Sequence, residues 1–127
     1  MWRYYMRIAL IAGVLHPLSV YANESVCADD KRVIAPCFDV SGRLSIHANL
    51  RPYLHVPKTR RILGIALASD TVDGKYMWPE NIGRNITPEK DIWGNYRVCP
   101  LTSAQAGTQQ LVCIDAVSDM RVQPVTR

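Results

Sequence analysis

Four cysteines, Cys27, Cys37, Cys99 and Cys113, are the feature that most limits what this chain of 127 residues can fold into. A four-cysteine zinc site needs thiolates in close pairs, typically about two to four residues apart. The two closest pairs here are separated by nine and thirteen intervening residues, which is a poor match to that spacing. An even number of cysteines in a short exported chain instead indicates two disulfides. The fold therefore depends on whether the chain is exported.

The first 22 residues indicate export. They carry Arg3 and Arg7 and no acid before an apolar run at residues 8–15, and they end in small or modest residues up to Ala22. This order is typical of a secretory signal peptide, with cleavage after Ala22. An eight-residue run is too short to cross a bilayer, which needs roughly 20 apolar residues. We therefore predict a periplasmic or secreted protein, with residues 23–127 as one domain and no transmembrane span after cleavage.

Four cysteines allow three pairings, and their spacing does not choose among them. Local strand geometry favours Cys27–Cys37 together with Cys99–Cys113, because Cys99 and Cys113 flank what is predicted to be one hairpin. Each bridge would stabilise the fold by about 2–4 kcal/mol, mainly by restricting the unfolded chain.

The mature chain is predicted to be mainly β. Apolar and polar residues alternate from Phe38 to Ala48, as in a half-buried strand, and Gly42 within it marks a bulge or a close approach of the backbone. Four further strands are predicted, at residues 53–56, 61–68, 96–102 and 109–116, with Gly107 in the last turn. Residues 61–68 are apolar for most of their length, as in a strand buried on both faces, and a buried helix turn is the alternative there.

Residues 69–95 are rich in Gly and Pro and are predicted to be a loop with one short helix. Thr87 followed by Pro88 gives that helix an N-cap and a suitable first residue. Residues 120–127 are predicted to be a frayed tail. Three strands, a helix and two strands are the order of a five-stranded Greek-key barrel of the oligonucleotide/oligosaccharide-binding (OB) type. A small β-sandwich or an open meander is the alternative architecture.

Several short motifs are similar to those of an uncharacterised family of small exported proteins of Gram-negative bacteria. They are a Gly-Arg-Leu strand at residues 42–44, a Leu-Gly strand at residues 63–64 and a Val-Cys-Pro hairpin at residues 98–100, with a second Val-Cys at residues 112–113. Residues 47–58 depart from the pattern, since that family more usually has an Asn-Gly turn and a Trp-bearing strand there. The resemblance implies an exported location and this fold, and it implies no activity.

Composition and motifs argue against several classes of function. Removing Arg3 and Arg7 lowers the formal charge from +4 to +2, too little for a typical nucleic-acid-binding protein. The chain contains none of the common hydrolase, metalloprotease, phosphate-loop or dinucleotide motifs. We therefore predict no catalytic residue, no cofactor and no metal.

The titratable residues support the same prediction. His47 and His55 come without a third ligand that the sequence nominates, so we expect ordinary surface or strand histidines. Asp70, Asp73 and Glu80 could supply an acid/base pair, but scattered loop carboxylates are usually only solvated.

Two features are candidate binding surfaces. Lys58, Arg60 and Arg61 form the one dense basic run; if it were extended, Lys58 and Arg60 would share a face, and a solvated loop between two strands is the alternative. Trp78 and Trp93 lie in the predicted loop, where they either form a stacking platform or, as we favour, cap the open end of the barrel.

The sequence thus predicts an exported binding or adaptor module. Its partner would be an anionic glycan or lipid headgroup of the cell envelope, or a periplasmic protein. The alternative is an envelope enzyme inhibitor or an enzyme that acts through residues 69–95.

Overall fold

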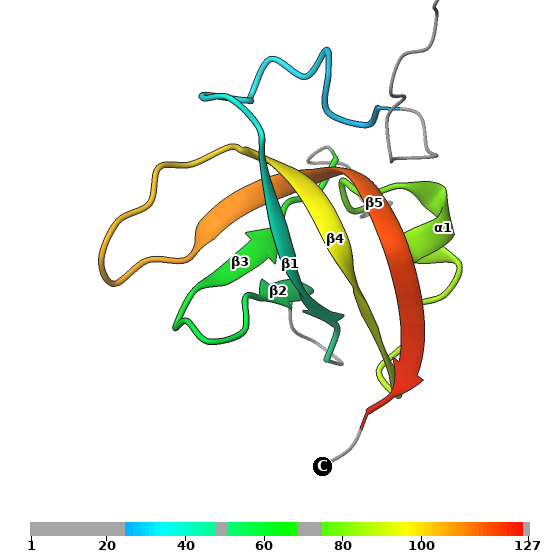
Figure 1. The fold of residues 1–127 in the computed structure, drawn as a ribbon. Coiled ribbons are helices and arrows are strands. Elements are labelled where there is room, and N and C mark those ends of the chain that lie inside the picture. The colour runs from blue at the N-terminus through cyan, green and yellow to red at the C-terminus, as the bar shows by residue number, and fades with distance from the viewer. Residues whose placement is uncertain (1–24, 48–50, 69–74, 126–127) are drawn as a thin grey trace, which may run out of the picture.

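The computed structural model of the protein describes residues 25–47, 51–68 and 75–125; the predicted signal segment and cleavage site lie outside them. The described residues form five strands and one short helix (Figure 1). In chain order these are β1 (Phe38–Ser45), β2 (Tyr53–His55), β3 (Ile62–Ile65), α1 (Glu80–Gly83), β4 (Lys90–Pro100) and β5 (Gln110–Pro124). The strands close into a barrel in the order β1-β2-β3-β5-β4. The predicted OB-like barrel, with its helix between the third and fourth strands, is confirmed.

β1 shows why the chain closes into a barrel. It pairs antiparallel with both β2 and β4, and Leu44 lies opposite Leu54 on one side and Ile92 on the other. All three side chains are fully buried, so the alternating pattern packs one face of β1 against the interior. Gly42 marks a close approach, as predicted, since a Cβ there would lie 2.5 Å from the carbonyl oxygen of His55. Only glycine fits at this bend of the barrel.

β4 and β5 form a hairpin much longer than predicted. β4 begins at Lys90, six residues before the expected start, and β5 continues to Pro124. The expectation of a frayed tail from Met120 is wrong because the early part of β4 provides a partner for it, with Asp91 opposite Gln123. Parallel pairing of β3 with β5 then closes the barrel.

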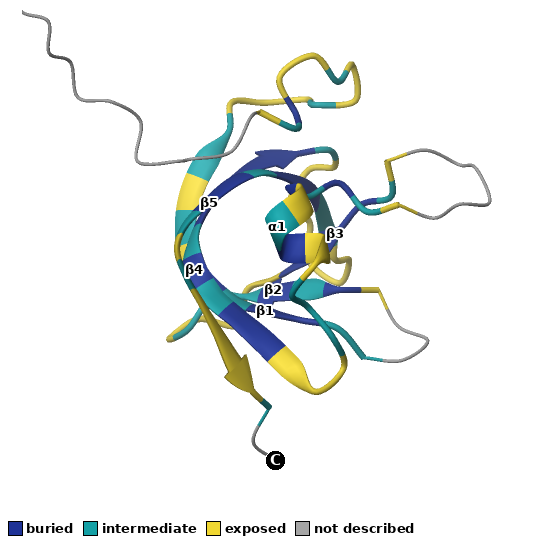
Figure 2. Cartoon of the chain, turned by 90° about the vertical axis from the view of Figure 1, so that its right-hand side faces the viewer, coloured by how far each residue is buried: buried dark blue, intermediate teal, exposed yellow. Residues whose placement is uncertain are grey.

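The barrel interior is apolar and is covered at one end by α1 (Figure 2). Ile82 of α1 is fully buried against the barrel core, and Tyr76 and Trp78 pack beside it. The helix predicted at Thr87 is wrong. That residue instead makes a bridge with Lys90 that leads directly into β4, and the helix forms earlier, at Glu80–Gly83, where Ile82 reaches the core.

A second, smaller core lies outside the barrel, beneath the N-terminal segment of residues 25–37. Its buried members are Cys27, Ala66, Met77, Cys99 and Cys113. In Figure 1 this segment, drawn in blue to cyan, lies above the upper parts of β4 and β5. It is attached by a hydrogen bond from the Ile34 amide to the Pro100 carbonyl oxygen at 3.0 Å. Asp115 Oδ1 also accepts hydrogen bonds from Ser25 Oγ at 2.6 Å and from the Cys27 amide at 2.8 Å.

The two disulfides join this segment to the hairpin. The predicted pairing is wrong, since the bonds are Cys27–Cys113 and Cys37–Cys99. The predicted register is nevertheless right, because Cys99 and Cys113 lie opposite each other on β4 and β5. Both side chains point away from the barrel, toward residues 25–37, so each sulfur bonds to the segment that covers it. Disulfides of this kind persist in non-reducing compartments.

Candidate functional site

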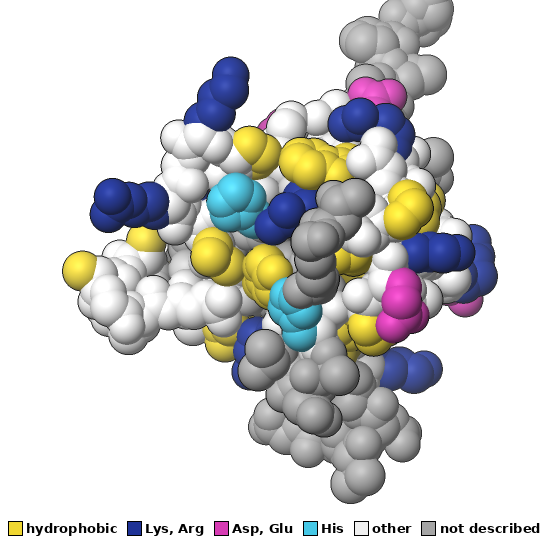
Figure 3. All heavy atoms as spheres, turned by 90° about the horizontal axis from the view of Figure 1, so that it is seen from below, with side chains coloured by type: hydrophobic (Ala, Val, Ile, Leu, Met, Phe, Trp, Pro, Cys, Tyr) yellow, Lys and Arg dark blue, Asp and Glu magenta, His cyan; other side chains and the backbone are white. Residues whose placement is uncertain are grey.

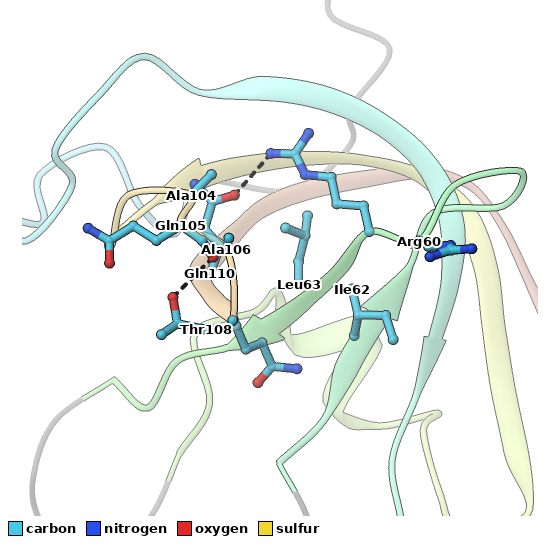
Figure 4. Close-up of a pocket in the computed structure, with 11 residues that line it drawn as sticks. Arg60, Ile62, Leu63, Ala104, Gln105, Ala106, Thr108 and Gln110 are labelled. Atoms are coloured by element: carbon cyan, nitrogen blue, oxygen red, sulfur yellow. Dashed lines mark hydrogen bonds between the residues drawn. The ribbon is translucent and has the colours of Figure 1, made fainter.

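A groove on the described part of the protein lies between the start of β3 and the β4–β5 loop (Figure 4). It has a volume of about 600 Å³ and is lined by residues 60–63 and 104–110, which we call the basic groove. Its floor includes Ile62, an apolar side chain that is 43% exposed. The opposite wall is the exposed loop of residues 104–109, which turns at Gly107, where φ is +84°. Because Gly107 has no side chain, a ligand in the groove can approach the loop backbone closely at that position.

Arg61 is the fixed cation of the basic groove. Its Nη2 donates a hydrogen bond to Gln110 Oε1 at 2.9 Å, and its guanidinium carbon lies 4.9 Å from the centre of the Phe38 ring. Contacts on two sides hold the side chain in place, so its remaining donors are presented with a defined geometry.

Lys58 and Arg60 are presented differently, on the turn between β2 and β3. Both are exposed, and Figure 4 shows Arg60 on the far side of Ile62 from the loop. Lys58 has a left-handed backbone with φ of 66°, so the run is a turn and the extended arrangement of alternating faces does not occur. The structure therefore places Arg61 on the groove wall, Arg60 at its rim, and Lys58 outside its lining.

The two candidate tryptophans occupy different environments. Trp78 is partly buried against the barrel core and its ring centre lies 5.1 Å from that of Tyr76, which fits the expected cap. Trp93 does not lie in a loop. It stands on β4 between buried Ile92 and Gly94, and it faces outward and is partly exposed. The described part of residues 69–95 thus uses Trp78 for packing, while Trp93 belongs to the outer face of the sheet.

This outer face was missed by the sequence analysis. Arg43, Asp91, Trp93, Asn95 and Arg121 project from neighbouring strands β1, β4 and β5; we call this set the Trp93 face. Figure 3 views the lower end of the barrel, where histidine, basic and hydrophobic side chains lie next to one another. The signal was the alternation of polar and apolar residues from Asp91 to Arg97, which marks a half-buried strand. The Gly and Pro residues of 69–95 favour a loop instead, and that prediction is wrong from Lys90 onward, where β4 begins.

The histidines do not form a metal site in the described ranges. His47 Nε2 lies 2.9 Å from the Tyr53 hydroxyl, and the centres of the two rings are 5.5 Å apart in a stacked arrangement. His55 lies on β2, opposite Arg43 of β1. Among the described residues, one group brings three potential ligand atoms within 4.8 Å of one another, namely Cys27, Cys99 and Asp115. Both sulfurs are in disulfides, and a metal requires thiolates, so this group cannot bind a metal while the bridges are intact.

The carboxylates singled out from the sequence do not assemble in the described structure. Glu80 forms an exposed ion pair with Arg84 at 2.7 Å along α1, while Asp70 and Asp73 lie outside the described residues. Among the described titratable groups, Tyr96 has the most strongly shifted pKa: burial and the nearby charge of Asp91 raise the pKa of its phenol far above the ordinary value. Its hydroxyl donates a 2.6 Å hydrogen bond to the Ile92 carbonyl oxygen inside the barrel, which gives it a structural role.

Comparisons with protein-family models, with curated proteins and with solved structures gave no match. The resemblance to a family of exported proteins therefore stays a prediction. Within the described ranges, every helix is too short to cross a membrane.

Proposed function

We propose that the protein is an exported, non-catalytic binding module that uses the basic groove to hold an anionic group of the cell envelope, carried by a glycan or a lipid headgroup. The observation that carries this proposal is the position of the one dense basic run. Arg60 and Arg61 lie at the groove between the third strand and the β4–β5 loop, and OB-type barrels bind their ligands with the second and third strands and this loop.

The contacts of Arg61 favour an anion as the ligand. Its guanidinium is held between Phe38 and Gln110 and offers further N–H donors in a planar arrangement that suits phosphate or carboxylate oxygens. Ile62 beside it supplies apolar contact for the body of a headgroup or a sugar ring. Nucleic acid is a poorer candidate because it is scarce outside the cytoplasm and the predicted mature charge is only +2.

The strength of binding follows from the small net charge. A mature charge of +2 creates no long-range field, so attraction has to come from the groove itself. Exposed charges are screened over about 8 Å at physiological salt. Binding is therefore expected to be local and strongly reduced by salt.

The test compares elution of matched variants at increasing salt. The probes are vesicles containing phosphatidylglycerol, vesicles of phosphatidylcholine alone, and immobilised polygalacturonate. The double variant Lys58→Asn with Arg60→Ser removes two cations; asparagine tolerates the left-handed backbone at position 58. A third variant, Arg61→Gln, removes the fixed cation. Lys31→Ser with Lys75→Ser is the control, because it removes the same charge from exposed positions away from the groove.

We expect Arg61→Gln and the double variant to elute at lower salt than the parent and the control. Loss of retention on the lipid alone, or on the polysaccharide alone, identifies the source of the anion. If the parent, the groove variants and the control all elute at the same salt concentration from both anionic probes, the proposal is wrong.

A further inference from the structure

A second site lies on the outer face of β1, β4 and β5, where two polar hollows meet at Trp93. The first hollow, of about 230 Å³, is lined by residues that include Arg43, Ser45 and Asp91. The second, of about 460 Å³, is lined by residues that include Asn95 and Arg121. Trp93 lines both, and neither shares a residue with the basic groove. A ligand that fills both hollows therefore contacts Trp93, whose ring centre lies 6.0 Å from the guanidinium carbon of Arg43.

The first hollow is lined by a hydrogen-bond donor, Arg43, and an acceptor, Asp91. Arg43 Nε lies 3.8 Å from Asp91 Oδ2, too far for a direct hydrogen bond, and Nε is buried with no hydrogen-bond partner in the described part of the chain. Because Nε is buried, a ligand in the hollow meets the exposed part of the Arg43 side chain, which is 35% exposed, beside the Asp91 carboxylate, whose side chain is 11% exposed.

The second hollow is shaped by a bulge in β5. Trp93 pairs with Arg121 and Asn95 with Ser118, so the single residue Gly94 lies opposite two residues of β5. One of these, Asp119, has a left-handed backbone with φ of 53° and is exposed on the outer side. Bulges of this kind redirect side chains and are frequent beside binding sites.

A hydrogen-bonded chain fixes the polar groups of the second hollow. Ser41 Oγ donates to Asn95 Oδ1 at 2.5 Å, and Asn95 Nδ2 donates to Asp119 Oδ2 at 3.0 Å. These bonds run across β1, β4 and β5, so the groups are held on three strands of a closed barrel. Sites held on strands are more rigid than sites on loops, and a rigid site loses less entropy when it binds.

From these contacts we propose that the Trp93 face is a saccharide-binding site that takes at least two sugar rings across Trp93. The aromatic ring has an electron-rich face that attracts the C–H groups of a sugar. Hydroxyls both donate and accept, so they match the mixed set formed by Arg43, Asp91 and Asn95. The two arginines of the face are balanced in formal charge by Asp91 and by Asp119, which lines the second hollow, and this balance suits an uncharged polyhydroxylated ligand.

The same features disfavour other ligands. Asp91 and Asp119 would repel the phosphates of an oligonucleotide, although nucleobases can also stack on tryptophan. An extended peptide would need an unpaired strand edge, and β4, which carries Trp93, is paired on both sides there, with Arg43 of β1 and Arg121 of β5. The proposal is independent of the basic groove, because the two sites share no lining residue.

Nuclear magnetic resonance can test the site through its own indole. The chain after Ala22 contains two tryptophans, Trp78 and Trp93, so the labelled protein gives two indole N–H signals. The probes are the neutral trisaccharides cellotriose, maltotriose and N,N′,N″-triacetylchitotriose, with oligothymidylate as the competing ligand class. We expect at least one trisaccharide to shift the Trp93 signal in a saturable way while the Trp78 signal, inside the barrel cap, stays in place.

Variants then assign the contacts. Trp93→Ala should weaken binding of that trisaccharide about tenfold or more, as expected for loss of a stacking partner. Asp91→Asn and Arg121→Ser, which keep the tryptophan, should also weaken it. Arg84→Ser, at the C-cap of α1, is the control that matches the charge change of Arg121→Ser and should not weaken it. The proposal is overturned if none of the three sugars moves the Trp93 signal, if oligothymidylate alone does so, or if Asp91→Asn and Arg121→Ser bind as tightly as the control.

Discussion

The outer face of the β4–β5 hairpin is used in two ways along its length. Its upper half carries Cys99 and Cys113, with Leu101 and Leu111 packed beside them. The N-terminal segment covers these side chains and is bonded to the two cysteines through disulfides. Its lower half carries the Trp93 face, which the described segments leave partly exposed. The two strands pair through both halves, with register shifts between Trp93 and Asn95 and between Arg97 and Val98, and the halves differ in their outward-facing residues. Apolar residues and cysteines make one half part of the fold, and polar residues around a tryptophan leave the other half available to a ligand.

Loss of a bridge in the upper half should have the largest effect on stability. The double variant Cys37→Ala with Cys99→Ala frees a loop closed across a sequence separation of 62 residues. We expect a cost of about 2–5 kcal/mol, mainly through the larger freedom of the unfolded chain. The melting temperature, measured by calorimetry, should fall by about 10 °C or more. A fall of only one or two degrees would mean that bonding the N-terminal segment to the hairpin contributes little to the free energy of unfolding.

The next largest effect should come from the hydrogen bonds that attach the N-terminal segment, residues 25–37, in addition to its disulfides. Asp115→Ala removes the acceptor of the hydrogen bonds from Ser25 and from the Cys27 amide. A hydrogen bond to a charged group contributes about 1.5–3 kcal/mol to stability. Because the two disulfides still hold the N-terminal segment, the loss of stability should be confined to that segment. Hydrogen exchange should accelerate in residues 25–37 and stay slow in the barrel strands. Asp119→Ala, on the lower half of the same strand, is the control and should leave exchange in that segment unchanged.

The sequence predicted the barrel because its signals are local. Alternation in β1, glycine at 42 and the turn at Gly107 each act over a few residues, and the structure confirms them. The disulfide pairing was predicted wrongly because it depends on a segment that crosses the sheet from far away in the chain. The register that brings Cys99 opposite Cys113 says nothing about what lies above them.

The same distinction between local signals and long-range arrangement applies to the two candidate sites. The basic run was visible as a cluster in the sequence, and the structure adds the groove beside it. The Trp93 face could not be assembled from sequence, because Arg43 and Arg121 lie far from Trp93 in the chain and come beside it only through strand pairing. The early start of β4 also went unrecognised, and with it the partner that turns residues 120–124 into strand.

A smaller effect on stability is expected at alkaline pH. It comes from Tyr96, whose phenol lies inside the barrel, beneath the lower half of the hairpin. The pKa of Tyr96 is raised by burial and by the charge of Asp91, whereas the unfolded chain releases this proton near pH 10. Stability from the neutral phenol is therefore present below about pH 10 and lost as the pH rises above it. Tyr96→Phe should cost about 1 kcal/mol at neutral pH through the hydrogen bond to Ile92, and it should flatten the decline in melting temperature above pH 10. An unchanged alkaline slope in the phenylalanine variant would contradict this assignment.

The smallest effect on stability should come from the charges of the lower half. Arg121 is exposed on β5, and exposed charges contribute about 0–1 kcal/mol, so Arg121→Ser should change the melting temperature by no more than a few degrees. Its counterpart in the upper half is Arg97, which lies 3.9 Å from the carboxylate of Asp115 and is also partly exposed. Arg97→Ser should be similarly mild for stability, and the two variants should differ in binding. Only Arg121→Ser should weaken the saccharide-dependent shift of the Trp93 indole signal, because only Arg121 lines a hollow that Trp93 shares. Equal weakening by both variants would mean that general charge, and not the arrangement around Trp93, distinguishes the two halves of the hairpin.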